Sequence, residues 1–545
     1  MIKLSPETDS MVARINGTVS YPPRTLNPLT CVKMSSTELI ALAASVLFII
    51  LFTQRWKRRA LLLPPGPRPL PIFGNLFDVP KESSWLTYTE WAKTYGDVMS
   101  LRVFGQVIVV LNSEKSAREF LEKRATIYSG RPALPFFELL KWSDWNMAFF
   151  SDTVLWRQRR RILDRGLRPS AAVQYWPIQQ EKVHDFLKIL LSNPEDFRQH
   201  IKYLQGTIIM SSVYGYDVKD HNDTYLRDAI DANLLGQKAL LPGGIIVNSF
   251  PFLKHFPGWL PGMGFHALAR EGERIGHDML HRPFELVKDR MRSGTVRPCI
   301  TQTNLLELEE ANSADFKEAE CAIAEAAGSL YLAGADTTAA AISTLFLALT
   351  LYPDVQRRAQ VELDVITEGK RLPNYEDRNR LPYVGAVCKE VLRWRMVAPA
   401  GVPHTSTQDD VFEGYFIPKG TIVIANTWAI LRDPNVFPDP DEFKPERFLT
   451  HSGQLRDDPT LTAVFGFGKR ICPGRHLAED TLSIVAASLL ATYSIGKAKD
   501  AQGHEIAVGR GYTGGIISSP KEFKCSIAPR SAAAKALIAA QKWNS

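Results

Sequence analysis

The chain is organised around one stretch near its end, Phe465-Gly466-Phe467-Gly468-Lys469-Arg470-Ile471-Cys472-Pro473-Gly474. Its glycines let a backbone wrap closely under a flat ligand where side chains would collide. Cys472 is the candidate metal ligand, and Arg470 is expected to place a cation near its sulfur. The pattern turns helical from about Arg475, and the positive end of a helix favours a thiolate in front of it. The alternative is a buried structural cysteine beside a glycine-rich turn.

The pattern F-x-x-G-x-R-x-C-x-G is complete over this stretch, and it resembles the haem-binding loop of the cytochrome P450 family. The resemblance extends over about residues 64–525. It implies a mainly α fold with smaller β-sheets and a haem b group whose iron takes Cys472 as its axial ligand. It also implies that Phe465 and Arg470 contact this group. In the family, the thiolate pushes electron density onto the iron and favours cleavage of dioxygen.

Composition sets the broad class of the protein. The chain has 545 residues, of which 45% are hydrophobic, and a net charge of +7. No basic stripe with interleaved aromatic residues occurs, so nucleic acid is not an expected partner, and the mild positive charge favours acidic proteins or anionic membranes. The six cysteines include no C-x-x-C pair. This spacing argues against a zinc site or a disulfide scaffold and fits a reducing compartment.

The amino-terminal part predicts attachment to a membrane. Residues 1–34 are polar and aperiodic, so we expect a disordered extension, in which Asn16 fits a glycosylation acceptor. Residues 35–56 hold an apolar core followed by a basic cluster, which predicts a single-pass transmembrane helix with the catalytic domain in the cytosol. A signal peptide or a buried helix is the alternative. Residues 57–70 then form a proline-rich hinge, and residues 71–545 form the haem-thiolate catalytic domain.

Local patterns predict several further elements. β-Branched residues predict a hairpin of strands 98–103 and 106–111, and Ser113 is expected to cap the following helix. Residues 179–236 have a helical pattern without chemical motifs. Residues 397–402 resemble a pocket-lining strand of the family.

Two segments rich in aromatic residues bear on the substrate. Residues 133–150 either pack against the core or membrane, or line an apolar substrate pocket, and both roles can be shared among them. The irregular residues 240–263 resemble the substrate-access region of the family, which dips into the membrane.

Three residues resemble the groups that hold the haem propionates in the family. Trp156 and Arg160 are four residues apart, share a helix face and match the motif W-x-x-x-R. His404 follows a proline at a position that contacts a propionate. The arginines beside this motif form either a solvated helix face or a docking surface for an acidic electron donor: Arg157, Arg159, Arg161 and Arg165.

The long helical pattern of residues 314–351 is interrupted by Ala333-Gly334-Ala335-Asp336-Thr337-Thr338. Glycine, an acid and two threonines are poor helix formers, and threonine hydroxyls can bond back to the preceding turn and open it. The stretch resembles the oxygen-activation signature of the family. By that resemblance Gly334 makes room for dioxygen, while Asp336 and Thr337 relay protons so that one oxygen atom leaves as water. A simple helix kink is the structural alternative.

A set of charges completes the pattern. Glu390 and Arg393 fit E-x-x-R at helical spacing, and Arg447 follows in a segment that, in the family, joins them in a buried network beneath the haem loop. Buried charges must satisfy one another, so we assign these three residues a structural role rather than a catalytic one.

Together the motifs predict a membrane-anchored haem-thiolate monooxygenase at the endoplasmic reticulum, similar to fungal microsomal members of secondary metabolism. Electrons would come from NADPH through a separate reductase, since no flavin- or nicotinamide-binding fingerprint follows the haem portion. The expected substrate is a hydrophobic small molecule such as a terpenoid, although an indole or a polyketide would also fit. The alternatives are a haem-thiolate isomerase or dehydratase acting on hydroperoxides, and a non-catalytic membrane haem-binding protein.

Overall fold

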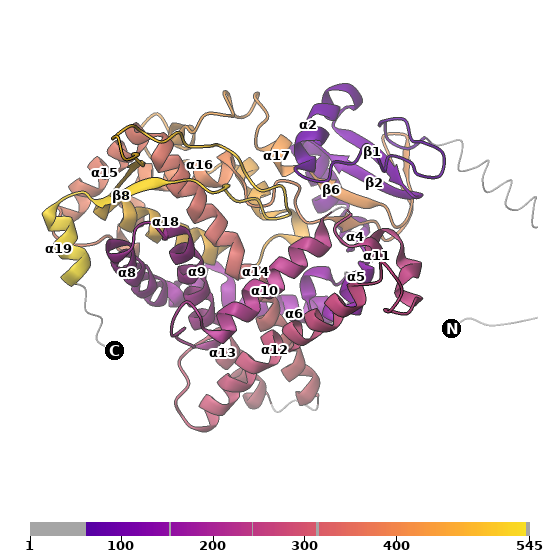
Figure 1. The fold of residues 1–545 in the computed structure, drawn as a ribbon, viewed down its shortest axis with the longest axis horizontal. Coiled ribbons are helices and arrows are strands. Elements are labelled where there is room, and N and C mark those ends of the chain that lie inside the picture. The colour runs from indigo at the N-terminus through magenta and orange to yellow at the C-terminus, as the bar shows by residue number, and fades with distance from the viewer. Residues whose placement is uncertain (1–61, 152–153, 242, 312–314, 541–545) are drawn as a thin grey trace, which may run out of the picture. The chain divides into compact units, whose positions relative to one another are not determined.

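A computed structural model describes residues 62–540 except 152–153, 242 and 312–314. The predicted extension at 1–34, the predicted transmembrane helix at 35–56 and the start of the hinge lie outside the described residues. From Leu62 onward the chain forms one compact unit, which is mainly helical with small sheets, as predicted (Figure 1).

The central element is α14 (Phe316–Leu351), which confirms the helix predicted at 314–351. It is α-helical throughout, so the predicted interruption is absent. Within the described part of the chain, α14 is the one helix long and apolar enough to cross a membrane, and most of it is buried inside the protein. Its apolar composition therefore belongs to a core helix.

Hydrophobic side chains surround α14 in two large clusters. One gathers around the carboxyl-terminal half of α14, including Leu345 and Phe346. The other surrounds its amino-terminal half, including Ala326 and Tyr331. The helices that form these clusters are long and amphipathic or buried: α6 (Val154–Leu167), α8 (Trp176–Ser192), α9 (Phe197–Tyr214), α10 (Thr224–Leu240), α12 (Phe265–Arg292), α13 (Ile300–Glu310), α15 (Pro353–Thr367), α16 (Pro382–Trp394) and α18 (Arg475–Thr492).

Apart from the 12-residue α2, the other helical elements are short. They are α2 (Ser84–Tyr95), α3 (Glu114–Arg118), η1 (Glu119–Lys123), α4 (Ala125–Tyr128), α5 (Pro135–Leu139), η2 (Trp142–Asp144), η3 (Met147–Phe149), α7 (Pro169–Ala172), η4 (Val173–Tyr175), α11 (Ile246–Ser249), η5 (Pro251–His255), η6 (Tyr375–Arg380), α17 (Thr427–Ile430), η7 (Pro445–Phe448), η8 (Pro459–Phe465), η9 (Gly468–Arg470) and α19 (Ala532–Ala540). The Ser113 side chain accepts a hydrogen bond from the Ser116 backbone N–H, which confirms the predicted cap of α3.

The largest sheet among the described residues has the strand order β1–β2–β6–β3. Strands β1 (Val98–Val103) and β2 (Gln106–Leu111) form the predicted hairpin at the predicted residues, and its turn has positive φ angles at Phe104 and Gly105. Strand β6 (Ile422–Ala425) pairs parallel with β2, and β3 (His404–Thr405) pairs antiparallel with β6. This sheet lies with α2 at one end of the compact unit (Figure 1). The remaining strands form two antiparallel pairs: β4 (Asp410–Phe412) with β5 (Tyr415–Ile417), and β7 (Tyr493–Lys497) with β8 (Cys525–Pro529).

The described end of the hinge lies against β1. Ser100 donates from its backbone N–H to the Pro65 carbonyl over 2.7 Å and from its hydroxyl to the Pro64 carbonyl over 2.6 Å. A Cβ built on Gly66 would lie 1.8 Å from the Ser100 carbonyl oxygen. The glycine between the prolines therefore permits this close approach, and the backbone is held before it enters the fold.

Residues 397–402 do not form the predicted strand. Pro399 and Pro403 cannot donate to a ladder, and Gly401 has a φ of +59°, which a regular strand does not use. Isolated hydrogen bonds hold the segment instead. One of them is the bond that the Val397 carbonyl accepts from the Ser518 backbone N–H over 2.8 Å.

The predicted Glu390–Arg393–Arg447 network is present, and it fixes α16 to the segment that precedes η7. The fully buried Glu390 carboxylate accepts two hydrogen bonds from Arg393, of 2.6 and 2.8 Å, and one of 3.4 Å from Arg447. Arg393 also donates to the carbonyl oxygens of Leu431 and Pro440. Every charge of the network is thus paired or hydrogen-bonded, as a buried ion pair requires.

We predict that Glu390→Gln lowers the unfolding temperature and removes the haem that the sequence resemblance implies. The substitution leaves Arg393 buried without its carboxylate, at a cost of about 3–5 kcal/mol. Haem absorbance per protein and thermal unfolding measure both effects. Glu446→Gln is the matched control, because Glu446 is exposed and pairs with Arg358 at the surface. Full haem content with an unchanged unfolding temperature in Glu390→Gln would contradict the structural role.

Candidate functional site

The Cys472 loop is shaped by its glycines. Gly466 and Gly468 have φ angles of +88° and +55°, which other residues rarely adopt. A Cβ built on Gly468 would also lie 2.2 Å from the Leu121 carbonyl oxygen. The collision that the glycine avoids is therefore with a neighbouring backbone. The loop closes where the Cys472 backbone N–H donates to the Phe465 carbonyl over 2.8 Å, just before α18 begins at the predicted residue.

Cys472 is half-buried, and the burial of its thiol raises the pKa. The Gly474 backbone N–H and the charge of Arg160 act in the opposite direction without reversing the shift. Arg160, and not the predicted Arg470, is therefore the cation with the largest effect on the pKa of Cys472. A metal held by this sulfur would ionise the thiol outright, so a thiolate would form when the metal binds.

Arg470 belongs instead to a cationic cluster, which we define as Arg131, Trp156, His404 and Arg470. The Arg470 guanidinium lies 4.1 Å from the ring centre of Trp156 and donates to the carbonyl oxygens of Ser129 and Phe150. His404, at the start of β3, is buried, and its Nδ1 donates to the Tyr128 carbonyl over 2.8 Å. The cluster thus joins the sheet, α6 and the Cys472 loop.

The charges of the cationic cluster act on one another. Burial lowers the pKa of Arg131 to about 9, and Arg470 adds to the shift. Burial, followed by Arg131, holds the pKa of His404 well below its usual value, so His404 is neutral. Within the described residues Arg131 donates only to carbonyl oxygens, those of Ala148, Val402 and Pro403. The cluster is therefore a place where an anionic group would be stabilised.

Of the two predicted helix residues, the structure brings Trp156 into this cluster but directs Arg160 elsewhere. Arg160 donates to the Ile471 carbonyl over 2.6 Å and to both carboxylate oxygens of Asp164. It therefore holds the Cys472 loop directly.

One face of α14 is open although the helix is otherwise buried. Ala333 is exposed and Thr337 is half-exposed, while the helix before and after them is buried almost throughout. Leu330, Ala333 and Thr337 share this face by their spacing. A Cβ built on Gly474 would lie 3.9 Å from both Leu330 Cδ1 and Cys472 Sγ. The open face therefore lies beside the Cys472 loop.

Three consecutive carbonyl groups of α14 accept hydrogen bonds from side chains at this point. The Leu332 carbonyl accepts from Asn233 of α10 over 3.1 Å, and the Gly334 carbonyl accepts from Gln205 of α9 over 2.9 Å. Between them, the Ala333 carbonyl accepts from the Thr337 hydroxyl over 3.0 Å, as predicted for a threonine that bonds back. These bonds supplement the backbone hydrogen bonds of the helix, and those from Asn233 and Gln205 tie α10 and α9 to α14.

Gly334 has a role in helix packing, in place of the predicted role of making room for dioxygen. A Cβ at this position would lie 2.6 Å from Ile209 Cδ1 of α9, so the glycine permits close packing of two helices. Ala333, and not Gly334, lies on the open face of α14. The space that was predicted beside Gly334 is therefore beside Ala333.

Asp336 is an acid held in a largely apolar surrounding. Burial raises its pKa, and the charge of Lys202 on α9 opposes this shift. Its Oδ2 accepts from Gln237 Nε2 of α10 over 3.4 Å. Asp336 and Thr337 thus supply a carboxyl group and a hydroxyl group next to the open face of α14.

These features fit a haem group. A thiol in a close loop suits an iron ligand, an open helix face suits a flat ring, and the cationic cluster suits the anionic propionates of that ring. Arg131, Asn233, Gln205 and Gln237 take part in the site although the sequence did not single them out. They belong to no short motif, so their roles follow only from the packing of α9, α10 and the sheet against α14.

The aromatic residues 133–150 are mostly core. Phe136, Phe137 and Trp142 are almost completely buried, whereas Phe149 and Phe150 are half-exposed. This favours core packing for most of the segment and leaves its end available to a ligand.

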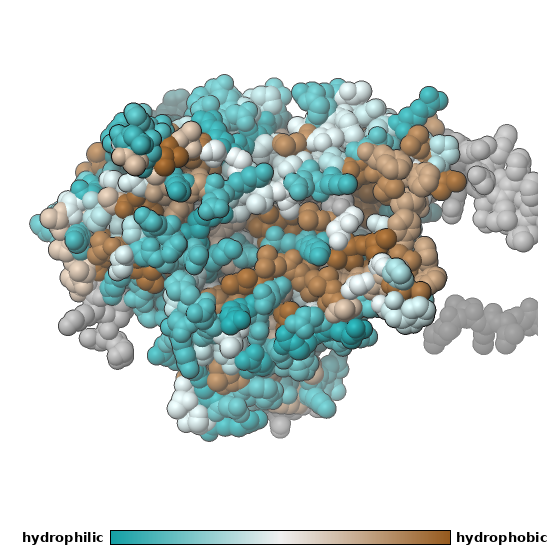
Figure 2. All heavy atoms as spheres, in the orientation of Figure 1, coloured by the Kyte–Doolittle hydropathy of each residue, from teal (hydrophilic) through white to brown (hydrophobic). Residues whose placement is uncertain are grey.

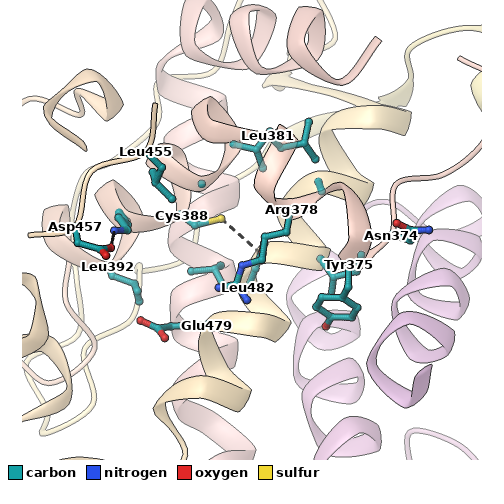
Figure 3. Close-up of a pocket in the computed structure, with 16 residues that line it drawn as sticks. Asn374, Tyr375, Arg378, Leu381, Cys388, Leu392, Leu455, Asp457, Glu479 and Leu482 are labelled. Carbon is teal, nitrogen blue, oxygen red and sulfur yellow. Dashed lines mark hydrogen bonds and ion pairs between the residues drawn. The ribbon is translucent and has the colours of Figure 1, made fainter. Parts of the chain in front are cut away.

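A separate cavity of about 230 Å³ lies between α16, α18 and η6 (Figure 3). Cys388 and Glu479 line it, and Lys389 pairs with Asp457 over 2.8 Å at its rim. Neither Cys472 nor any residue of the cationic cluster lines this cavity. It is distinct from the candidate haem site.

Comparisons with known proteins agree with this geometry. The sequence model of the cytochrome P450 family matches residues 64–525. Cytochrome P450 monooxygenase COX2 of Coprinopsis cinerea is 40% identical over 88% of this chain and 92% of its own length. Cytochrome P450 monooxygenase 208 of Postia placenta is 39% identical over 91% of this chain and 96% of its own. Tryptamine 4-monooxygenase of Psilocybe cyanescens is 36% identical over 86% and 93%. The chain therefore belongs to the cytochrome P450 family, as a cytochrome P450 monooxygenase.

Proposed function

We propose that this protein is a membrane-anchored monooxygenase of the endoplasmic reticulum that inserts one oxygen atom from O2 into a hydrophobic small molecule. The observation that carries the proposal is the open face of α14 at Ala333 and Thr337, beside the Cys472 loop. An otherwise buried helix that exposes a small residue and a hydroxyl next to a candidate metal ligand provides both space and a proton donor.

Haem binding rests on the residues already described. Cys472 would ligate the iron, Phe465, whose carbonyl closes the loop, would contact the haem, and the cationic cluster would hold the propionates. Arg160 supports the loop by its bond to the Ile471 carbonyl. Haem held by a thiolate supplies the redox chemistry that activates dioxygen.

Asp336 and Thr337 handle protons. The raised pKa of Asp336 brings a carboxyl group closer to the pH at which it can both take and give a proton. The Thr337 hydroxyl donates to the Ala333 carbonyl and can accept from a further donor. Asp336 and Thr337 argue against the alternatives of a hydroperoxide isomerase or dehydratase, because those reactions need no delivery of protons to dioxygen.

Electrons come from NADPH through a separate reductase, for which the arginines of α6 offer a basic surface. Arg157, Arg161 and Arg165 are exposed. Arg159, by contrast, is buried and pairs with Glu325 of α14 over 2.8 Å, so it is part of neither a solvated face nor a docking surface. A basic surface attracts an acidic electron donor over long range.

The catalytic domain itself rests on the membrane through an aromatic face, which we define as Phe73, Phe77, Phe104, Phe250, Phe252 and Phe256. Successive rings of this face lie 5.0–6.2 Å apart and join the segment after the hinge, the β1–β2 turn and the residues in and around η5. Figure 2 shows hydrophobic residues gathered on this side of the protein. In the same loop Trp259 is 80% exposed. An exposed apolar surface of this extent supports contact with lipid.

The substrate is a hydrophobic small molecule, and a terpenoid or another secondary metabolite is the class we favour. The half-exposed Phe149 and Phe150 and the aromatic face support an apolar substrate that arrives from lipid. An indole is the second class, because one relative is named for its action on tryptamine.

We predict that the reduced protein with carbon monoxide shows a Soret band shifted far to the red, and that Cys472→Ala abolishes this band. Thiolate ligation causes the shift, so the variant loses it even if haem remains bound. Cys321→Ala is the matched control, because Cys321 is an exposed cysteine of α14. A haem spectrum without the shift in the unchanged protein would favour a non-catalytic haem-binding protein.

We predict that Thr337→Val and Asp336→Asn lower product per NADPH by about 100-fold, the usual contribution of a positioned acid or base. Reductase, NADPH and two probes, tryptamine and a sesquiterpene alcohol, allow product and peroxide to be measured together. Thr337→Ser retains the hydroxyl and most of the activity. Ser343→Ala is the control, since Ser343 also bonds back on α14 but is buried. Equal product yield in Thr337→Val and the unchanged protein would disprove the proton relay.

We predict that Trp259 lies within the lipid when the full-length protein is reconstituted in bilayers. Brominated lipids should quench part of the tryptophan fluorescence, and Trp259→Phe should remove that part because the exposed ring sits at the interface. Trp176→Phe serves as control, since Trp176 stacks on Tyr375 with a 4.5 Å separation. Identical quenching in Trp259→Phe and the unchanged protein would show that this loop stays out of the membrane.

A further inference from the structure

Gln237 lies where three parts of the protein meet beside Asp336. Its Nε2 donates from α10 to Asp336 Oδ2 on α14. Its Oε1 lies beside Gly515, because a Cβ built on that glycine would lie 3.8 Å from it. Among the described side chains, no other donates a hydrogen bond to this carboxylate. The position of the acid therefore depends on Gln237.

Helix α10 is held on α14 in a fixed register by contacts along one of its faces. The Tyr331 hydroxyl of α14 donates to the Tyr225 carbonyl over 2.5 Å, and Asn233 donates to the Leu332 carbonyl. Gln237 follows one helical turn after Asn233, close to the end of α10. It is thus the last of these contacts before the irregular segment that carries the exposed Trp259. A shift of this end of α10 would break the contact to Asp336 first.

The electrostatic surroundings of Asp336 suit a neutral hydrogen-bond donor such as Gln237. Burial disfavours the ionised form of Asp336, and Lys202 of α9 is the charged group whose field opposes this effect. Gln237 is neutral and exchanges no proton, so its amide orients the carboxylate without competing for the proton. At 3.4 Å the bond is long, and such bonds tighten when a catalytic site is filled.

We propose that Gln237 is a positioning residue that holds the Asp336 carboxyl group in place for proton delivery and ties this placement to the packing of α10 on α14. The proposal rests on the monooxygenase function proposed above. It assigns to a residue outside the family signature a link between α10 and the acid of the site.

The first test measures the pH dependence of thermal unfolding in the haem-loaded, full-length protein. Because burial raises the pKa of Asp336 in the folded state, the ionised group lowers stability as the pH rises through that pKa, and a hydrogen-bond donor offsets part of this loss. Gln237→Leu should therefore lower the unfolding temperature by a few degrees at a pH well above the pKa of Asp336 and by much less at a pH below it. Lys238→Gln, at the next and exposed position, should have no such effect.

The decisive comparison repeats Gln237→Leu in an Asp336→Asn background. The pH-dependent part of the loss should disappear there, because no titrating carboxyl group remains. A loss of equal size at both pH values, or one that persists in the Asp336→Asn background, would mean that Gln237 only packs between helices, and it would overturn the proposal.

The second test uses reductase and NADPH without an added substrate and measures peroxide released per NADPH oxidised. Gln237→Leu should raise this ratio by about threefold, the expected loss from one modest hydrogen bond, while Lys238→Gln leaves it unchanged. An unchanged ratio in Gln237→Leu would overturn the proposal. If the unchanged protein shows no red-shifted Soret band with carbon monoxide, the proposed function fails, and the unfolding comparison still decides whether Gln237 positions Asp336.

Discussion

The hydrogen bonds that three neighbouring side chains make to α14 are the interaction on which the site depends. A long apolar helix gains stability from burial, but polar groups within it lose water and need partners. Asn233, Thr337 and Gln205 supply these partners to three successive carbonyl groups. The helix can therefore carry a carboxyl group and hydroxyl groups in its middle and still remain continuous.

The same requirement explains how the two halves of the site are brought together. The Cys472 loop packs on η1 because Gly468 allows its backbone to approach the Leu121 carbonyl more closely than a side chain would permit. Arg160 then holds the loop from α6, while Arg159, the preceding residue, pairs with Glu325 of α14. Consecutive residues on one helix thus anchor both the loop and the helix that it faces.

Sequence motifs predicted the parts of the site that are contiguous in the chain. The β1–β2 hairpin, the cap at Ser113 and the start of α18 follow from local rules, which act over a few residues. The Glu390 network was also foreseen, because the family resemblance supplied its distant third member. Arg131 and Gln237 were not foreseen, since each gains its role only when elements far apart in the chain pack together. The packing role of Gly334 was not predicted either, because Ile209, whose side chain the glycine accommodates, lies on another helix.

The placement of Asp336 shows how such packing sets chemistry as well as stability. An ionised carboxylate in this surrounding costs stability, and one long hydrogen bond from a neutral amide offsets only about 0.5–1.5 kcal/mol of that cost. The protein could avoid the cost entirely with an apolar residue at this position. It keeps the acid beside the open face of α14 and partners it with a neutral amide, which stabilises the charge less than an arginine would. A strong ion pair would hold the acid ionised, so a weak partner is the arrangement that leaves Asp336 able to carry a proton.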